Sequence, residues 1–218
     1  MAPKVAIVIY SMYGHIAKMA EAVKKGVEET GGSATIYQIP ETLPQEVLAK
    51  MYAPAKPDYP IMDATTLATF DAFIMGIPTR YGNFPWAVEG TLPALFLSFS
   101  FLPLFAFWDT TGGLWGSGAL AGKYAGAFVS TAGPGGGQEV TIQNAISTLT
   151  HHGVCFVPFG YSAAFPQLSN LSEVHGGSPW GAGTYAATDG SRQPSALELE
   201  IATLQGKQFY GVISKVNF

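Results

Sequence analysis

Apolar residues follow two different periods along this chain. Five short runs are almost continuously apolar, and between them apolar residues recur every three or four positions. Continuous runs are typical of strands covered on both faces, and the spaced positions are typical of amphipathic helices. The predicted strands cover residues 5–10, 34–39, 71–77, 123–129 and 154–159.

The helical pattern follows the strands in turn. A Gly31-Gly32 pair ends the first helix, and two capping boxes open later ones, Thr42 with Gln45 and Ser195 with Glu198. Residues 166–192 are glycine-rich and predict a loop. The predicted helical segments are residues 16–29, 45–51, 66–70, 138–152 and 195–216.

Alternation of strands and helices predicts a single α/β domain over residues 1–218, with a doubly wound parallel sheet. Five strands favour the flavodoxin-like order 2-1-3-4-5, with helices on both faces of the sheet. In that arrangement ligands bind outside the carboxyl ends of the strands. The loops after the first, third and fourth strands meet there, and all three have unusual compositions. We therefore expect the functional site at this edge.

The turn after the first strand, residues 10–16, leads directly into a helix N-terminus. Unpaired N–H groups and the helix dipole make such a turn a ready site for a phosphate. Gly14 lets the backbone approach a ligand, and the Ser11 hydroxyl can donate a hydrogen bond. The alternative is an ordinary turn in which Ser11 only caps the helix.

Composition narrows the possible partners and compartments. Charged residues make up only 12% of the chain and hydrophobic residues 48%, which suggests a surface partly covered in an oligomer or touching something apolar. The net charge of −4 argues against a nucleic-acid partner. The single cysteine, Cys155, excludes an intramolecular disulfide and fits a reducing compartment. Residues 1–4 run straight into the first strand, so we expect no signal peptide and a cytoplasmic protein.

Six motifs in order resemble the WrbA-like NAD(P)H:quinone oxidoreductases, among them the fungal 1,4-benzoquinone reductases. They lie at residues 11–16, 78–83, 109–115, 135–139, 151–153 and 189–194. Together they span nearly the whole chain. The resemblance implies a flavodoxin-like fold, bound FMN, and NADH or NADPH as co-substrate. It also implies a homotetramer or dimer with sites shared between subunits, and no metal.

By this resemblance, three loops hold the FMN. The first binds its phosphate, the second lines its ring, and in the third a proline replaces one N–H donor of the usual threonine-glycine run. The predicted cofactor-binding residues are Ser11, Met12, Tyr13, Gly14, His15, Ile16, Pro78, Thr79, Arg80, Tyr81, Gly82, Asn83, Ser130, Thr131, Ala132, Gly133, Pro134, Gly135 and His151.

The resemblance also implies catalytic and substrate-binding residues. His151 would donate a proton to a quinone oxygen, and Arg80 would favour the reduced, anionic flavin. Tyr13 and Trp115 would form flat walls for nicotinamide and quinone rings. Three of these residues have a structural alternative: His151 can close a helix C-terminus, Arg80 can pair with a carboxylate of a neighbouring subunit, and Trp115 can anchor an interface or the core.

The stretch from 86 to 105 departs from the family and is almost entirely apolar. Its length and its two prolines argue against a transmembrane helix. Three interpretations are open: an element buried in an oligomer interface, a surface element in peripheral contact with a membrane, or a segment foreign to the fold such as a retained intron. We favour the last, because the insertion carries no turn chemistry.

The sequence thus predicts an FMN-dependent NAD(P)H:quinone oxidoreductase that reduces quinones by two electrons in a ping-pong cycle. Two alternatives come from other classes. A flavodoxin-like electron carrier would need a strongly acidic docking face, which the modest net charge disfavours. A non-catalytic, membrane-associated oligomeric scaffold would be consistent with the apolar insertion and the sparse charge.

Overall fold

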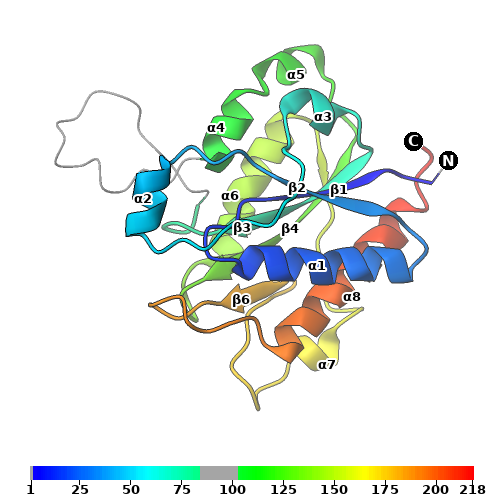
Figure 1. The fold of residues 1–218 in the computed structure, drawn as a ribbon. Coiled ribbons are helices and arrows are strands. Elements are labelled where there is room, and N and C mark those ends of the chain that lie inside the picture. The colour runs from blue at the N-terminus through cyan, green and yellow to red at the C-terminus, as the bar shows by residue number, and fades with distance from the viewer. Residues whose placement is uncertain (1, 84–102) are drawn as a thin grey trace.

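A parallel β-sheet lies at the centre of the computed structural model, which describes residues 2–83 and 103–218 (Figure 1). The strand order is β2-β1-β3-β4-β5, as the sequence predicts, and a sixth short strand, β6, also pairs with β4. The strands are β1 (Val5–Ile9), β2 (Ala34–Gln38), β3 (Ala72–Pro78), β4 (Tyr124–Thr131), β5 (Cys155–Phe156) and β6 (Gly183–Tyr185).

Helices cover both faces of this sheet. Their bounds are α1 (His15–Glu29), α2 (Gln45–Lys50), α3 (Ala64–Ala68), α4 (Pro103–Asp109), α5 (Gly112–Ser117), α6 (Gln138–His151), α7 (Phe165–Leu168) and α8 (Ala196–Ile213). Side chains alternate across a strand, so each strand feeds two separate cores. In β1, Ile7 belongs to the core under α1 and α8, and Val8 belongs to the core under α3, α4 and α6.

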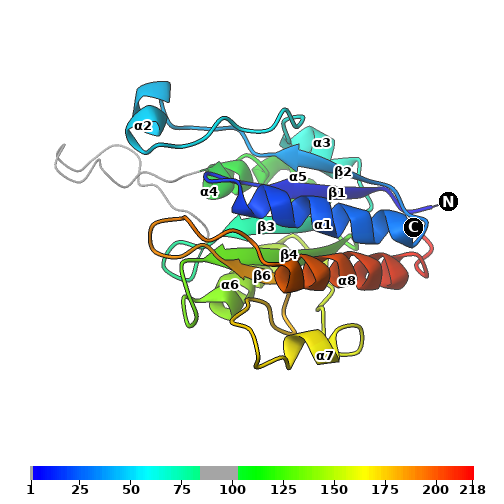
Figure 2. The same ribbon diagram turned by 60° about the horizontal axis from the view of Figure 1, so that its bottom comes forward.

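Helices α1 and α8 run side by side on one face (Figure 2). Their backbones touch at two glycines. A Cβ on Gly26 would lie 2.0 Å from the carbonyl oxygen of Thr203, and a Cβ on Gly206 would lie 2.1 Å from that of Val23. No larger residue fits at either position unless the helices separate. This contact fixes the distance between α1 and α8.

The edge beside β4 differs from the prediction. The fifth strand was expected over residues 154–159, but only Cys155–Phe156 pair, next to the first residues of β4. Residues 166–192 were expected to be loop, yet they contain β6, which pairs with the last three residues of β4. Two short strands therefore share one edge position. No local pattern indicated β6, because it has only three residues, Gly183–Tyr185, and its partners in β4 are distant in sequence.

Helix starts were predicted with mixed success. The capping box of Ser195 and Glu198 is confirmed at the start of α8. The box of Thr42 and Gln45 is wrong, because Pro44 is the N-cap of α2 and no side chain caps that helix. Helix α8 ends at Ile213, before the predicted end of this segment at residue 216.

The apolar insertion lies almost wholly outside the described residues. Its predictions, including the foreign-segment hypothesis, therefore remain predictions. From residue 103 the chain forms α4, which brings Leu104 and Phe107 into the core. Among the residues that the structure describes, no helix has the length and apolar character needed to cross a membrane.

The α1–α8 contact gives a matched pair of substitutions. Gly206→Ala should lower the free energy of unfolding by about 1–3 kcal/mol, because the new methyl group collides with backbone. Gly211→Ala, in the same helix with no atom within 4 Å of the new Cβ, should leave stability unchanged or raise it by about 0.5–1 kcal/mol. Urea unfolding of both variants measures this. Equal effects would contradict the packing described.

Candidate functional site

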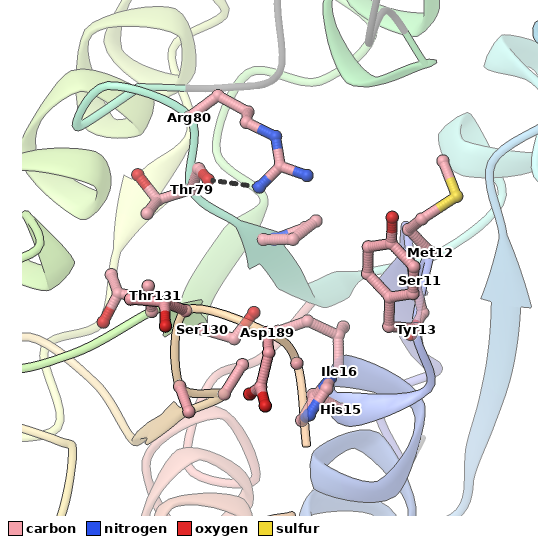
Figure 3. Close-up of a pocket in the computed structure, with 16 residues that line it drawn as sticks. Ser11, Met12, Tyr13, His15, Ile16, Thr79, Arg80, Ser130, Thr131 and Asp189 are labelled. Atoms are coloured by element: carbon pink, nitrogen blue, oxygen red, sulfur yellow. Dashed lines mark hydrogen bonds between the residues drawn. The ribbon is translucent and has the colours of Figure 1, made fainter. Parts of the chain in front are cut away.

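A cavity of about 310 Å³ opens at the carboxyl ends of β1, β3, β4 and β6 (Figure 3). Four loops contribute to it, and three of them are those predicted from the sequence. Its lining residues are Ser11, Met12, Tyr13, His15, Ile16, Pro78, Thr79, Arg80, Ser130, Thr131, Ala132, Ala186, Ala187, Thr188, Asp189 and Gly190.

The turn after β1 presents the start of α1 to this cavity. Gly14 is the N-cap with φ of 87°, a left-handed conformation that glycine adopts without strain. The Ser11 hydroxyl oxygen accepts from the Ala17 N–H at 3.3 Å, so Ser11 caps the helix and keeps its own proton to donate. The N–H groups of His15 and Ile16, one and two residues into α1, have no acceptor within the helix. The structure therefore confirms that Ser11 caps the helix, and the phosphate site stays a prediction, for which the N–H groups of His15 and Ile16 are two candidate donors.

Tyr10, the first residue of this turn, belongs to a cluster of polar side chains with Glu41 and Lys56. The Tyr10 hydroxyl donates to Glu41 at 3.1 Å, and Lys56 pairs with the same carboxylate at 2.5 Å. The Lys56 ammonium also lies 4.6 Å from the centre of the Tyr10 ring. Burial and the neighbouring Glu41 charge raise the pKa of Tyr10 well above its ordinary value. Tyr10 therefore stays neutral and serves as a fixed donor that anchors the end of β1.

The loop after β3 is held against α6. The Thr79 and Thr141 hydroxyls are hydrogen-bonded, and the Asn144 amide donates to the Gly82 carbonyl oxygen at 2.8 Å. Tyr81 has a positive φ of 55°, which is uncommon for a residue other than glycine. Pro78, Thr79 and Arg80 line the cavity, whereas residues 81–83 of the same loop do not.

The loop after β4 contains Pro134, which lacks the N–H donor that the family's usual threonine-glycine run would supply. Ser130, Thr131 and Ala132 line the cavity, and residues 133–135 do not. The Gly136 N–H donates to the Gly133 carbonyl oxygen, which closes a turn around Pro134. Pro134 is therefore not part of the cavity lining, and its missing N–H removes no donor from the cavity wall.

The fourth wall, residues 186–190, was missed as part of the site. Asp189 and Gly190 belong to a motif that the sequence singles out, but no role was predicted for it. The wall depends on β6 and on the buried Glu198 at the start of α8. Burial alone would raise the pKa of the Glu198 carboxyl, but Arg192 and several N–H and O–H donors outweigh it, so this pKa lies below its ordinary value. The sequence offered one related signal, the capping box of Ser195 and Glu198, which marks the start of α8 directly after the segment that contains this wall.

His151 and Trp115 do not lie at this cavity. Helix α6 starts beside the loop after β4 and runs 14 residues away from it, about 20 Å at 1.5 Å per residue. His151 is its last residue, and the next residues contact the chain just before β4, where the Gly122 N–H donates to the Gly153 carbonyl oxygen. His152 is bonded to the Thr111 hydroxyl at 3.0 Å, and Trp115 is 61% exposed on the adjacent α5.

Known proteins resemble this chain in sequence and in fold. The flavodoxin family model matches residues 7–153. The chain is 59% identical to NAD(P)H quinone oxidoreductase PST3 of Candida albicans over 99% of its own length and 100% of that protein. It is 56% identical to protoplast secreted protein 2 of Saccharomyces cerevisiae, over 98% of this chain and 99% of that protein.

A solved structure shares the fold. The flavodoxin, WrbA-like protein from Agrobacterium tumefaciens superposes with a TM-score of 0.61 at 23% identity, over 96% of each chain. The order of the strands, the site at their carboxyl ends and the full-length fungal relatives agree with this match. The chain belongs to the flavodoxin family and is homologous to the fungal NAD(P)H quinone oxidoreductases.

Proposed function

We propose that this protein is an FMN-dependent NAD(P)H:quinone oxidoreductase. The observation that supports the proposal best is the start of α1, which offers N–H groups to a cavity formed by loops of four strands. Curated relatives that align over nearly their whole length are named NAD(P)H quinone oxidoreductases. Bound FMN would accept a hydride from NAD(P)H and pass two electrons to the quinone.

The residues of the cavity fit a flavin mononucleotide. The N–H groups of His15 and Ile16 and the Ser11 hydroxyl would hold the phosphate. Pro78, Thr79 and Arg80 would line the ring, with the Arg80 guanidinium favouring negative charge on it. Tyr13, 38% exposed at the mouth, would stack on the ring of the nicotinamide or quinone. One shared place for both substrates implies ping-pong kinetics.

We infer further that His151 and Trp115 serve the cavity of another subunit. Both lie far from the cavity of their own chain, and both are exposed. A second copy that placed this end of the molecule over the cavity would supply a proton donor and an aromatic wall. The assembly would be a homodimer or homotetramer. The single cysteine supports a reducing compartment such as the cytoplasm.

The function is tested by adding FMN to the purified protein and recording its absorbance. We expect tight binding, followed by oxidation of NADH or NADPH that depends on added benzoquinone. Binding of FMN without quinone-dependent oxidation would favour the electron carrier. Failure to bind FMN would favour the non-catalytic scaffold.

The phosphate turn provides a sharper test. Gly14→Val should abolish FMN retention, because a β-branched residue does not adopt a φ of 87° without strain and would distort the turn. Gly31→Val is the matched control at the other end of α1, since Gly31 has φ of 84° and open space around its Cβ position. The control should lose similar stability and keep FMN. A Gly14→Val protein that purifies with full FMN would refute the phosphate site.

The role of His151 is tested by two variants together. His151→Ala should retain FMN and slow quinone reduction by about 100-fold or more, since a general acid typically contributes about 100-fold to 10,000-fold. Coexpression of His151→Ala with Gly14→Val should restore part of the activity, because mixed oligomers can join an intact cavity to an intact His151. Unchanged turnover in His151→Ala, or no gain in the mixed oligomers, would contradict a site shared between subunits.

A further inference from the structure

The segment between β6 and α8 has no function assigned by the proposal above. It begins where β6 leaves the sheet, with Thr184 beside Ser130 and Tyr185 beside Thr131. The Ala186 N–H then donates to the Thr131 carbonyl oxygen at 2.8 Å. Residues 186–190 therefore emerge at the same edge as the loop after β4 and line the same cavity.

An ion pair between the half-buried Arg192 and the buried Glu198 links the two ends of this segment and closes it into a ring. Glu198 is fully buried, and its carboxylate accepts from the Arg192 guanidinium and the Thr184 hydroxyl, both at 2.8 Å. The Arg192 guanidinium also donates to the Tyr185 carbonyl oxygen at 2.7 Å, and the Arg192 N–H donates to that of Ala186. A buried carboxylate is stable only with such partners, so Arg192 is strongly fixed.

This closed segment is also attached to the turn after β1, residues 10–16. The Arg192 carbonyl oxygen is 2.8 Å from Nε2 of His15, and because a carbonyl only accepts, the ring nitrogen carries the hydrogen. One turn further along α1, the Lys18 ammonium donates to the Gln193 side chain at 2.7 Å. Arg192 therefore links the wall to the first turn of α1. Figure 3 shows Asp189 of the wall on the same side of the cavity as His15 and Ile16.

The backbone of the wall is strained and retains unused donors. Ala187 has φ of 63°, in the left-handed region that residues with a Cβ rarely adopt. Such strain is typical of ligand clamps held in place by the surrounding structure. Among the described residues, no hydrogen bond is donated by the main-chain N–H of Ala187 or Thr188.

We propose that residues 186–190 bind the phosphate end of the flavin as a fourth wall, and that Arg192 and Glu198 position this wall. The inference rests on the proposed FMN function. The wall is tied to the first turn of α1, so it belongs to the phosphate end of the cavity and not to the ring end. It should therefore distinguish FMN from riboflavin, which carries no phosphate.

The first experiment removes the positioning pair. Replacing both members, Arg192→Met with Glu198→Gln, leaves no unpaired buried charge. Titration of flavin-stripped protein should show FMN affinity reduced about 10-fold or more and riboflavin affinity changed less than about 3-fold. The control, Lys207→Met, breaks the 2.7 Å ion pair of α8 with Glu29 on α1 and should leave both affinities unchanged. Equal loss for both flavins, or no loss in a folded double variant, overturns the proposal.

The second experiment tests the wall itself and does not depend on the ion pair. Thr188 is exposed, so Thr188→Glu should not affect folding. Its negative charge should weaken FMN binding about 10-fold relative to Thr188→Gln, of the same size and neutral, and leave riboflavin binding unchanged. Equal FMN affinity in the two variants overturns the proposal. If the wild-type protein binds neither flavin, the proposed FMN function itself fails.

Discussion

Parallel pairing of β1, β3 and β4 is the constraint on which the rest of the structure depends. Because the three strands run in one direction, their carboxyl ends meet at one edge, and the loops that follow them face one another. Each loop must then be followed by a helix that returns along a face of the sheet. The first of these helices, α1, therefore starts at the edge where the cavity lies and presents its N–H groups to it.

The two faces of the sheet contribute differently to the site. On one face, α1 and α8 approach until their backbones touch at Gly26 and Gly206, which fixes the distance between the two helices. Glu198, in the first turn of α8, is buried beside β6. Its carboxylate accepts hydrogen bonds from residues on both sides of the segment that forms the fourth wall, residues 186–190. On the other face, α6 holds the loop after β3 through Thr141 and Asn144. Packing far from the cavity thus decides the shape of its walls.

The same geometry separates the proposed functional residues into two groups. A helix that starts at the cavity must end at the opposite edge, so His151 at the end of α6 cannot reach the cavity of its own chain. Trp115 lies on the neighbouring α5, and both residues are exposed. If they take part in catalysis, they do so in an oligomer. Cofactor binding would then be a property of one subunit, and turnover a property of the assembly.

The sequence by itself determined the strand order, most helices and three of the four cavity walls. These depend on short-range signals: apolar runs such as residues 71–77, the glycine at the start of α1, and the capping box of Ser195 and Glu198. The resemblance to known quinone reductases supplied the chemistry.

Only the tertiary structure decided the fourth wall, the direction of the loop around Pro134, and the distance of His151 from the cavity. Each of these depends on contacts between residues far apart in the chain. β6 forms because β4 offers it a free edge, and Arg192 is fixed because Glu198 is buried. The local sequence does not predict such contacts. The partner that stabilises each element, β4 for β6 and Glu198 for Arg192, comes into contact with it only when the sheet and its helices assemble.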